Sequence, residues 1–292
     1  MIAALQDRIG TRFRRIITSA PDGVPPWLGE VARGDDAGMF APTDAPWRVH
    51  ANLSTLIGGI RALLVQALHP GSLAGVAQHS RYEQDALGRL AGTTKWLTIM
   101  TFGSQEAIAA EAARVNGMHA KVTGTYGDQR QTYRASDPDL LMWVHVAFTD
   151  SFLSTFQLYS GQCVNADEYV SQWARAVAPL GLHDAPTSEA GLHAMLASYE
   201  PVLHVSDTTR RVVQFIRRPP LSRTARTAYW FLFQAAVASL PGEYRRMLGL
   251  RTAPLWLVRP MARGLLRAMR LALGPRSPME EAALARRARI GA

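Results

Sequence analysis

Apolar residues recur at steps of three and four positions along most of the chain, which is the period of an amphipathic α-helix. The clearest run begins at Asn52 and ends at His69-Pro70, because proline disfavours helix in the residue before it. Its apolar positions are Leu53, Leu56, Ile57, Ile60, Leu64 and Leu68. This spacing predicts a helix from about residue 52 to about residue 68.

Two further helices have recognisable starts. Asp137-Pro138 places a capping residue before a proline that suits the first helical turn, and predicts a helix to about Tyr159. Asn165, with Glu168 three residues later, matches the capping-box pattern for a helix through Trp173. Further helical patterns cover residues 83–100, 104–123, 188–204 and 222–239.

Strand patterns are hard to find in this sequence. Sustained alternation of apolar and polar residues is lacking, and no glycine-rich turn joins a strand to a helix as a nucleotide-binding loop requires. We therefore predict an all-α fold with one large helical domain over residues 51–250. An irregular N-terminal arm with a short helix (residues 1–50) precedes it, and a basic amphipathic helical segment (residues 251–292) follows it.

The composition is that of a folded globular protein, with 48% hydrophobic and 19% charged residues among 292. Cys163 is the only cysteine, which excludes an intramolecular disulfide and cysteine-based zinc or iron–sulfur sites. Residues 1–20 interrupt their apolar positions with charges, so they lack the core of a signal peptide, and we expect a cytoplasmic protein.

The net charge of +9 comes from arginine, much of it beyond residue 209. Residues 254–274 combine four arginines with apolar positions: Arg259, Arg263, Arg267 and Arg270 with Leu255, Val258, Met261, Leu265, Leu266 and Met269. Such a helix either lies on anionic lipid at the inner face of the membrane or docks on the core with its arginines in solvent. No zinc finger or RNA-binding motif is found, so we predict no nucleic-acid partner.

Two histidines fall on apolar helix faces. His119 shares a stripe with Ile108, Ala112, Val115 and Val122, with Met118 beside it. His145 shares a face with Leu141, Phe148, Phe152 and Tyr159. A buried imidazole needs partners for its ring nitrogens, because an unpaired buried polar group costs about 1–3 kcal/mol. Each histidine is therefore either a hydrogen-bonded core residue or a ligand or catalytic group.

Two more groups of residues carry candidate chemistry. Arg89, Thr93 and Trp96 are spaced i, i+4 and i+7, so they share one helix face, where Arg89 would bind an anion if buried or form a salt bridge if exposed. His69 and His79 flank a glycine-containing segment, and either loop hydrogen bonds or a role in a site explains them.

Four stretches together resemble one known family. They are "ALHPGSLAGVAQHS", "RLAGTTKWLTIMTFG", "RVNGMHAKVTG" and "YRASDPDLLMWVHVAFTDS". They are similar to the oxygenases typified by the fungal enzyme MpaB and the bacterial rubber oxygenase, or latex clearing protein, from about residue 50 to 180 and more weakly to residue 250. The resemblance implies an all-helical protein that holds haem b on a histidine.

The resemblance also implies roles for the candidate residues. His119 matches the proximal iron ligand, and an apolar slot with one nitrogen donor suits a haem. Arg89 would hold a propionate or a distal polar species, and Thr93 would donate a hydrogen bond beside dioxygen. The other candidate cofactor contacts are His145, His69, His79 and Trp96.

One position departs from the family pattern. The rubber oxygenase reads Arg-x-x-Lys-Thr, and its lysine can ligate the distal side of the iron, whereas Gly92 stands at that position here. Lys95, one turn further on, is badly placed to replace it. The distal site of the iron would therefore be open. The missing lysine also weakens the inference that this protein cleaves polyisoprene as the rubber oxygenases do.

These observations predict a haem b-dependent oxygenase that acts on a small or apolar organic substrate with dioxygen. Two alternatives stay open. One is a haem-binding or haem-sensing protein without turnover, and the other is a cofactor-free helical protein that associates with a membrane.

Overall fold

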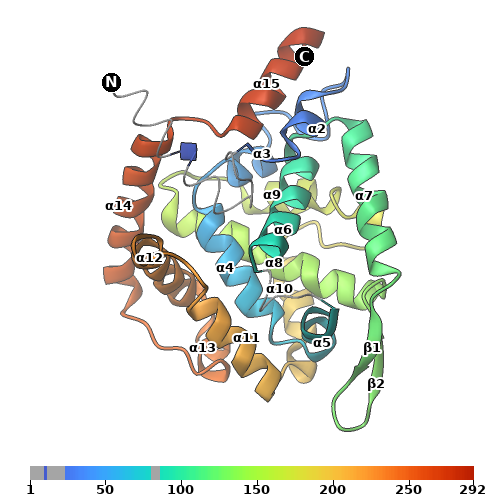
Figure 1. Cartoon of the computed structure of the whole chain (residues 1–292), viewed down its shortest axis with the longest axis vertical. Coiled ribbons are helices and arrows are strands. Elements are labelled where there is room, and N and C mark those ends of the chain that lie inside the picture. Colours follow the sequence, from blue (N-terminus) through green and yellow to red (C-terminus); the bar gives the residue numbers. More distant parts are fainter. Residues whose placement is uncertain (1–9, 12–23, 80–85) are drawn as a thin grey trace.

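The structure is a computed structural model that describes residues 10–11, 24–79 and 86–292, with only the backbone described at residues 86–90, 223 and 224. Its described part is a single, mostly helical domain, which confirms the predicted all-α class. Two long helices, α4 (Thr55–Gln66) and α8 (Pro138–Tyr159), pack against each other through its centre (Figure 1).

The remaining helices surround this central pair. Helix α12 (Arg223–Ser239) packs on α4, and α14 (Leu255–Leu273) packs on α12 and on α8. The other helices are α2 (Leu28–Ala32), α3 (Ala45–His50), α5 (Pro70–His79), α6 (Ala86–Phe102), α7 (Gln105–His119), α9 (Ala166–Ala174), α10 (Glu189–Ser198), α11 (Asp207–Arg217), α13 (Gly242–Met247) and α15 (Pro278–Ile290), with 3-10 turns η1 (Ala178–Leu180) and η2 (Glu200–Val202).

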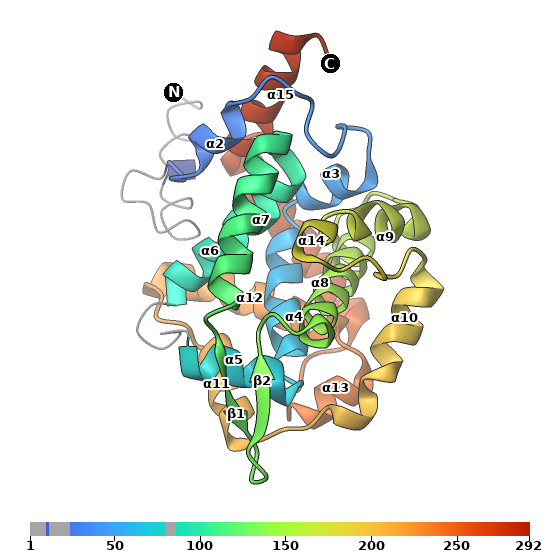
Figure 2. The same cartoon turned by 90° about the vertical axis from the view of Figure 1, so that its right-hand side faces the viewer.

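Helix α15 lies against α2 at one end of the molecule, so the last helix of the chain packs beside the first helix after residue 24 (Figure 2). The buried guanidinium of Arg286 on α15 donates hydrogen bonds to the backbone carbonyls of Val31 and Asp36. These carbonyl dipoles stabilise the buried cation, although its Nη2 is buried without a hydrogen-bond partner among the described residues.

The strongest sequence signals are confirmed. The patterns at residues 52–68, 137–159, 165–173 and 222–239 correspond to α4, α8, α9 and α12. The Asn165 side chain accepts a hydrogen bond from the Glu168 backbone N–H, as a helix cap should. The reciprocal half of the predicted capping box does not form, because the Glu168 carboxylate accepts from Gln172 instead.

The structure differs from the sequence prediction around residues 104–134. Helix α7 ends at His119, four residues before the predicted end. The chain then forms an antiparallel hairpin of β1 (Thr123–Tyr126) and β2 (Gln131–Arg134), with Thr123 opposite Arg134. Gly127 and Arg130 adopt positive φ in the turn between the strands.

Most buried side chains belong to one main core, and a small second cluster of Ala74, Tyr133 and Leu140 lies under the hairpin. Residues 70–79, a glycine-containing segment in the sequence, form helix α5, which packs on β1. Among the described helices, none has both the length and the hydropathy that crossing a membrane requires.

Candidate functional site

His119 is the last residue of α7. Ile108, Ala112 and Val115, which precede it on the predicted stripe, are buried, whereas Met118 is 46% exposed and does not belong to the apolar face. The His119 ring is half-buried, and its Nδ1 is buried with no hydrogen-bond partner among the described residues. Burial, and then the charge of Arg114, lower the pKa of His119, so the imidazole is neutral near pH 7 and able to bind a metal.

The hairpin brings the end of α7 close to the beginning of α8. The Ala135 N–H donates to the Val122 carbonyl over 2.9 Å and closes the base of the hairpin. The chain therefore leaves α7 at His119 and enters α8 at Pro138 in the same region, as Figure 1 shows. His145 follows Pro138 by two turns of α8, a rise of about 10 Å.

His145 is buried on α8 with 5% of its surface exposed. Its Nε2 has no hydrogen-bond partner within the described part of the chain. Burial lowers the pKa of His145 to about 4, so the ring is neutral at physiological pH. His145 thus keeps one buried ring nitrogen that no described residue hydrogen-bonds.

His50, which the sequence prediction missed, shows the opposite arrangement. It is buried, its Nδ1 lies 2.8 Å from Thr101 Oγ1, and its Nε2 lies 3.0 Å from the Tyr169 hydroxyl. Both ring nitrogens are satisfied by the protein, so His50 is a structural residue. The contrast separates His50, which only supports the core, from His119 and His145, which each keep a ring nitrogen that no described residue hydrogen-bonds.

His69 and His79 lie at the two ends of α5 and have different surroundings. His69 is buried against the rings of Trp143 and Tyr199 and lines a cleft of 850 Å³ between the hairpin, the start of α8 and η2. Burial is the largest cause that lowers the pKa of His69. His79 is exposed, and its Nε2 donates to the Thr123 carbonyl over 2.8 Å, which fixes β1 to α5.

Helix α6 carries the predicted polar face. The side chain of Arg89 lies outside the described residues, although its backbone belongs to the first turn of α6. Thr93 and Trp96 are half-buried, and Trp96 packs against the main core. At Gly92 an added Cβ would meet no atom within 4 Å, so the backbone there is open to solvent or to a ligand.

Lys95 forms ion pairs with two carboxylates. Its Nζ lies 2.7 Å from the Glu30 carboxylate and 3.5 Å from the buried carboxylate of Glu111. These ion pairs tie α6 to α2 and α7. They leave Lys95 bound elsewhere, in agreement with the expectation that it does not replace the lysine of the rubber oxygenases.

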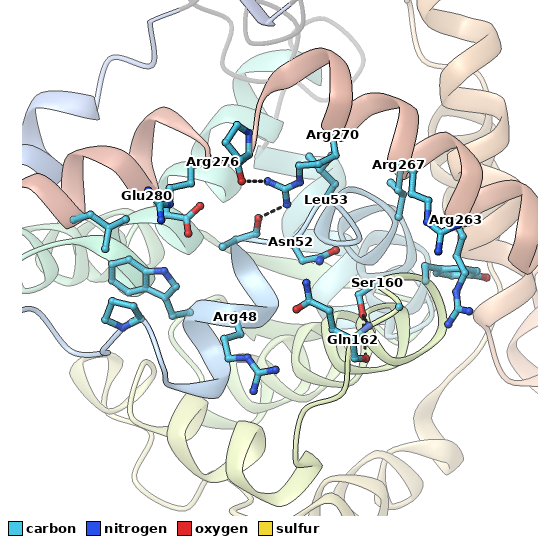
Figure 3. A pocket seen from close by; sticks show the side chains of 18 residues that line it. Arg48, Asn52, Leu53, Ser160, Gln162, Arg263, Arg267, Arg270, Arg276 and Glu280 are labelled. Atoms are coloured by element: carbon cyan, nitrogen blue, oxygen red, sulfur yellow. Dashed lines mark hydrogen bonds between the residues drawn. The ribbon is translucent and has the colours of Figure 1, made fainter. Parts of the chain in front are cut away.

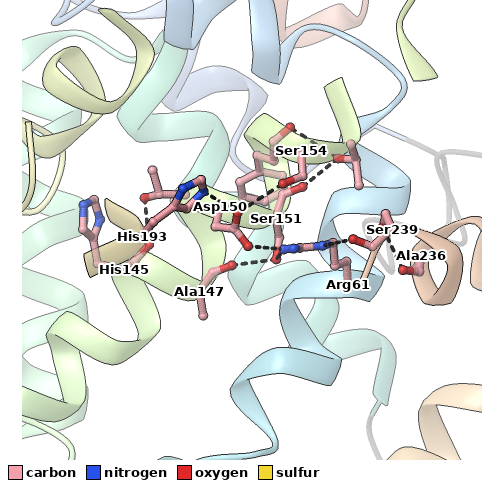
Figure 4. Close-up of polar contacts among 12 residues, drawn as sticks. Arg61, His145, Ala147, Asp150, Ser151, Ser154, His193, Ala236 and Ser239 are labelled. Carbon is pink, nitrogen blue, oxygen red and sulfur yellow. Dashed lines mark hydrogen bonds and ion pairs between the residues drawn. The ribbon is translucent and has the colours of Figure 1, made fainter. Parts of the chain in front are cut away.

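A polar network lies next to His145 on α8 (Figure 4). Arg61 on α4 pairs with Asp150 at 2.6 Å, and it donates to Ser151 Oγ at 2.8 Å and to the Ser239 carbonyl at 3.3 Å. The network connects α4, α8 and α12 and fixes the helix that carries His145. The Asp150 carboxylate also accepts from Ser154 and lies 4.0 Å from His193 Nε2.

The donor set fits an iron porphyrin better than a metal ion held by protein alone. Within the described ranges, no group of three or more His, Cys, Asp or Glu residues could hold a metal ion. A porphyrin supplies the equatorial nitrogens itself and needs one axial imidazole from the protein. His119, neutral and with an unpartnered buried nitrogen, is a residue of the required kind.

Comparison with known proteins identifies the family of the chain. The family model described as "ER-bound oxygenase mpaB/B'/Rubber oxygenase, catalytic domain" matches residues 47–273, a range that includes every candidate site residue. No curated protein and no solved structure matches the chain. Because the matched range covers most of the sequence and the fold is helical, the chain belongs to the family of MpaB-type oxygenases and rubber oxygenases.

Proposed function

We propose that this protein is a haem b-dependent oxygenase in which His119 is the iron ligand. The observation that carries the proposal is the neutral, partly buried imidazole of His119, at the position that matches the family's ligand. One of its ring nitrogens has no hydrogen-bond partner among the residues that the structure describes. Membership of an oxygenase family supports a reaction between dioxygen and an organic substrate. We propose a small, apolar molecule as that substrate.

Bound haem would supply the centre at which dioxygen is activated, and the protein would control access and orientation. His145 would use its unpartnered Nε2 to orient a haem propionate or the surrounding pocket. Arg89 would hold a propionate, and Thr93 would donate a hydrogen bond on the distal side. Gly92 would leave space for substrate there.

The remaining candidates have narrower roles in the proposal. Trp96 would contact the cofactor from its position at the edge of the main core. His69 lines the cleft beside the hairpin and would contact cofactor or substrate from that side. His79 already donates to Thr123, so we propose that it positions the hairpin next to His119.

The absorption spectrum of the purified full-length protein, reconstituted with haem b, tests the axial assignment. His119→Ala should abolish the Soret band or change its position, because the iron loses its protein ligand. His183→Ala is the matched control, since it removes an exposed imidazole with no role in the site. An unchanged spectrum in the His119→Ala variant would refute the assignment.

Oxygen consumption with candidate apolar substrates tests turnover. An oxygenase should consume dioxygen in proportion to product formed, and His119→Ala should abolish that consumption. A protein that binds haem reversibly but consumes no dioxygen with any reductant and substrate would instead be a haem carrier or sensor.

A further inference from the structure

A second cleft, of 520 Å³, lies away from His119 between α3, the end of α8, α14 and the segment that joins α14 to α15 (Figure 3). Five arginines line it: Arg48, Arg263, Arg267, Arg270 and Arg276. Among the described residues that line it, Glu280 is the only acidic one. None of these arginines forms an ion pair with a carboxylate in the part of the chain that the structure describes.

Three of the arginines are held in place by backbone carbonyls. Arg48 donates to the Cys163 carbonyl at 2.8 Å, Arg263 to the Leu158 carbonyl at 3.1 Å, and Arg270 to the Pro275 carbonyl at 2.6 Å. Carbonyl oxygens orient a guanidinium without neutralising it. Each of these side chains therefore keeps its full charge and further N–H donors for another partner.

Arg267 and Arg276 have no hydrogen-bond or ion-pair partner among the described residues, and both are exposed. Two arginines of α14 stabilise the C-terminal end of α8, because Arg259 and Arg263 both donate to the Leu158 carbonyl there. Arg267 and Arg276 do not contribute to this stabilisation, so the fold does not account for their presence in the cleft. A cluster of guanidinium groups without a counter-ion is unfavourable unless an anion binds between them.

We propose that this cleft binds a phosphate group. Several guanidinium forks can bind a phosphate bidentately, and the uncharged donors Asn52, Ser160 and Gln162 line the same cleft. Leu53, Leu266 and Leu284 add apolar lining, so the ligand combines a phosphate with an apolar part. An anionic phospholipid and a soluble phosphorylated metabolite both have this chemistry.

The surface of α14 favours the lipid as the source of the phosphate. Val258, Ala262 and Leu266 of α14 are buried, and the opposite face is exposed and apolar except for Arg267. The uncharged residues of that face are Leu257, Pro260, Met261, Gly264, Ala268 and Leu271, and Arg267 separates them from Trp256 at the edge. Trp256 is 76% exposed and Leu271 is 75% exposed, so they are available to enter the acyl region of a bilayer.

The arginines and the apolar face lie side by side on α14. Leu271 follows Arg267 by four residues, so their side chains are neighbours on the helix surface. A bilayer that contacts the apolar face would therefore bring phosphate headgroups to the cleft. The earlier expectation of two alternatives, an interfacial helix or a docked one, is replaced by a single helix that packs on the core with one face and offers the other to lipid.

Two binding measurements on the full-length protein test the proposal. The first is calorimetric titration with inorganic pyrophosphate, and the second is co-sedimentation with phosphatidylcholine vesicles with and without phosphatidic acid. Arg267→Gln/Arg276→Gln should raise the Kd for pyrophosphate by about 10-fold or more, because two charge-assisted contacts are lost. Arg217→Gln/Arg246→Gln, which removes two exposed arginines elsewhere, is the matched control and should bind like the parent.

The vesicle arm separates the two sources of phosphate. If lipid is the ligand, the parent protein should sediment only with acidic vesicles, less at high salt, and Trp256→Ser/Leu271→Ser should abolish sedimentation while it keeps pyrophosphate binding. Pyrophosphate binding without sedimentation would support the phosphate site with a soluble ligand. Failure of the parent to bind either probe, or equal binding by the cleft and control variants, would overturn the proposal. Neither measurement requires haem, so its outcome is independent of His119.

Discussion

The Arg61 guanidinium lies 2.6 Å from the Asp150 carboxylate in the interior, where the two side chains are 2% and 10% exposed. Arg61 is on the central helix α4 and Asp150 on α8, so the ion pair connects the two helices that pack most extensively against each other. Burial removes water from both charges, and only the attraction of the partner offsets that cost. Either charge alone would therefore be strongly unfavourable at this position.

Removal of one partner should therefore destabilise the fold strongly. Asp150→Asn keeps the size of the side chain but leaves the Arg61 charge unpaired, and we expect the free energy of unfolding to fall by about 3–5 kcal/mol. Asp207→Asn is the control, since Asp207 pairs with Arg210 at the surface, where an ion pair contributes about 0–1 kcal/mol. Chemical denaturation measures both, and equal losses in the two variants would contradict the assignment.

The buried histidines make stability depend on pH. Burial lowers the pKa of folded His50 from 6.5 to about 3, so below about pH 6.5 the unfolded chain binds a proton that the folded chain does not. Stability from this group is present above pH 6.5 and is lost as the pH falls towards 3, by up to about 1.4 kcal/mol per pH unit. His145, whose pKa is about 4 in the folded state, acts in the same direction.

The slope of unfolding free energy against pH, between about pH 7 and pH 5, measures this effect. In the His50→Gln variant, residue 50 does not titrate in that range. The slope of its unfolding free energy should therefore be shallower than that of the parent by up to about 1.4 kcal/mol per pH unit, which corresponds to one proton. The comparison of slopes does not depend on how much the substitution itself destabilises the protein. Identical slopes would show that His50 is protonated in the folded state.

The parts of the fold that the sequence predicts well are those with local signals. Helices α4 and α8 carry long apolar periodicities, and α8 also has proline in its first turn. The hairpin has no such signal, because β1 is only four residues long and none of its residues is fully buried. Its position depends on contacts from another element, such as the hydrogen bonds that Gln78 and His79 of α5 donate to β1.

In the candidate site, too, the residues with a local sequence signal were predicted and those that depend on distant contacts were not. His119 and His145 stand out because each places a titratable ring on an apolar helix face. His50 was missed because it ends a six-residue helix that follows an irregular segment, and its partners Thr101 and Tyr169 are 51 and 119 positions away. The cleft arginines come from α3, α14 and the segment after α14, so only the folded chain brings them together.

Gly92→Lys should restore the lysine that the rubber oxygenases have at this position. The substitution should be tolerated, since a Cβ at residue 92 meets no atom within 4 Å, and lysine favours helix over glycine by roughly 0.5–1 kcal/mol. In the haem-reconstituted protein we expect a six-coordinate spectrum and slower binding of external ligands such as carbon monoxide. Gly117→Lys, on α7 and equally uncrowded, is the control for the change from glycine to lysine.

Two adjacent glycines of α4, Gly58 and Gly59, offer a matched pair of substitutions. A Cβ at Gly58 would lie 2.6 Å from Phe152 Cδ1 and 2.8 Å from Thr155 Oγ1, whereas a Cβ at the adjacent Gly59 would meet nothing within 4 Å. Gly58→Ala should therefore push the two central helices apart and lower the free energy of unfolding by about 1–3 kcal/mol. Gly59→Ala should raise it by up to about 1 kcal/mol, because alanine favours helix over glycine without a steric penalty. Thermal and chemical denaturation of the two variants should thus shift in opposite directions, and a shift in the same direction would mean that α4 and α8 do not pack through Gly58.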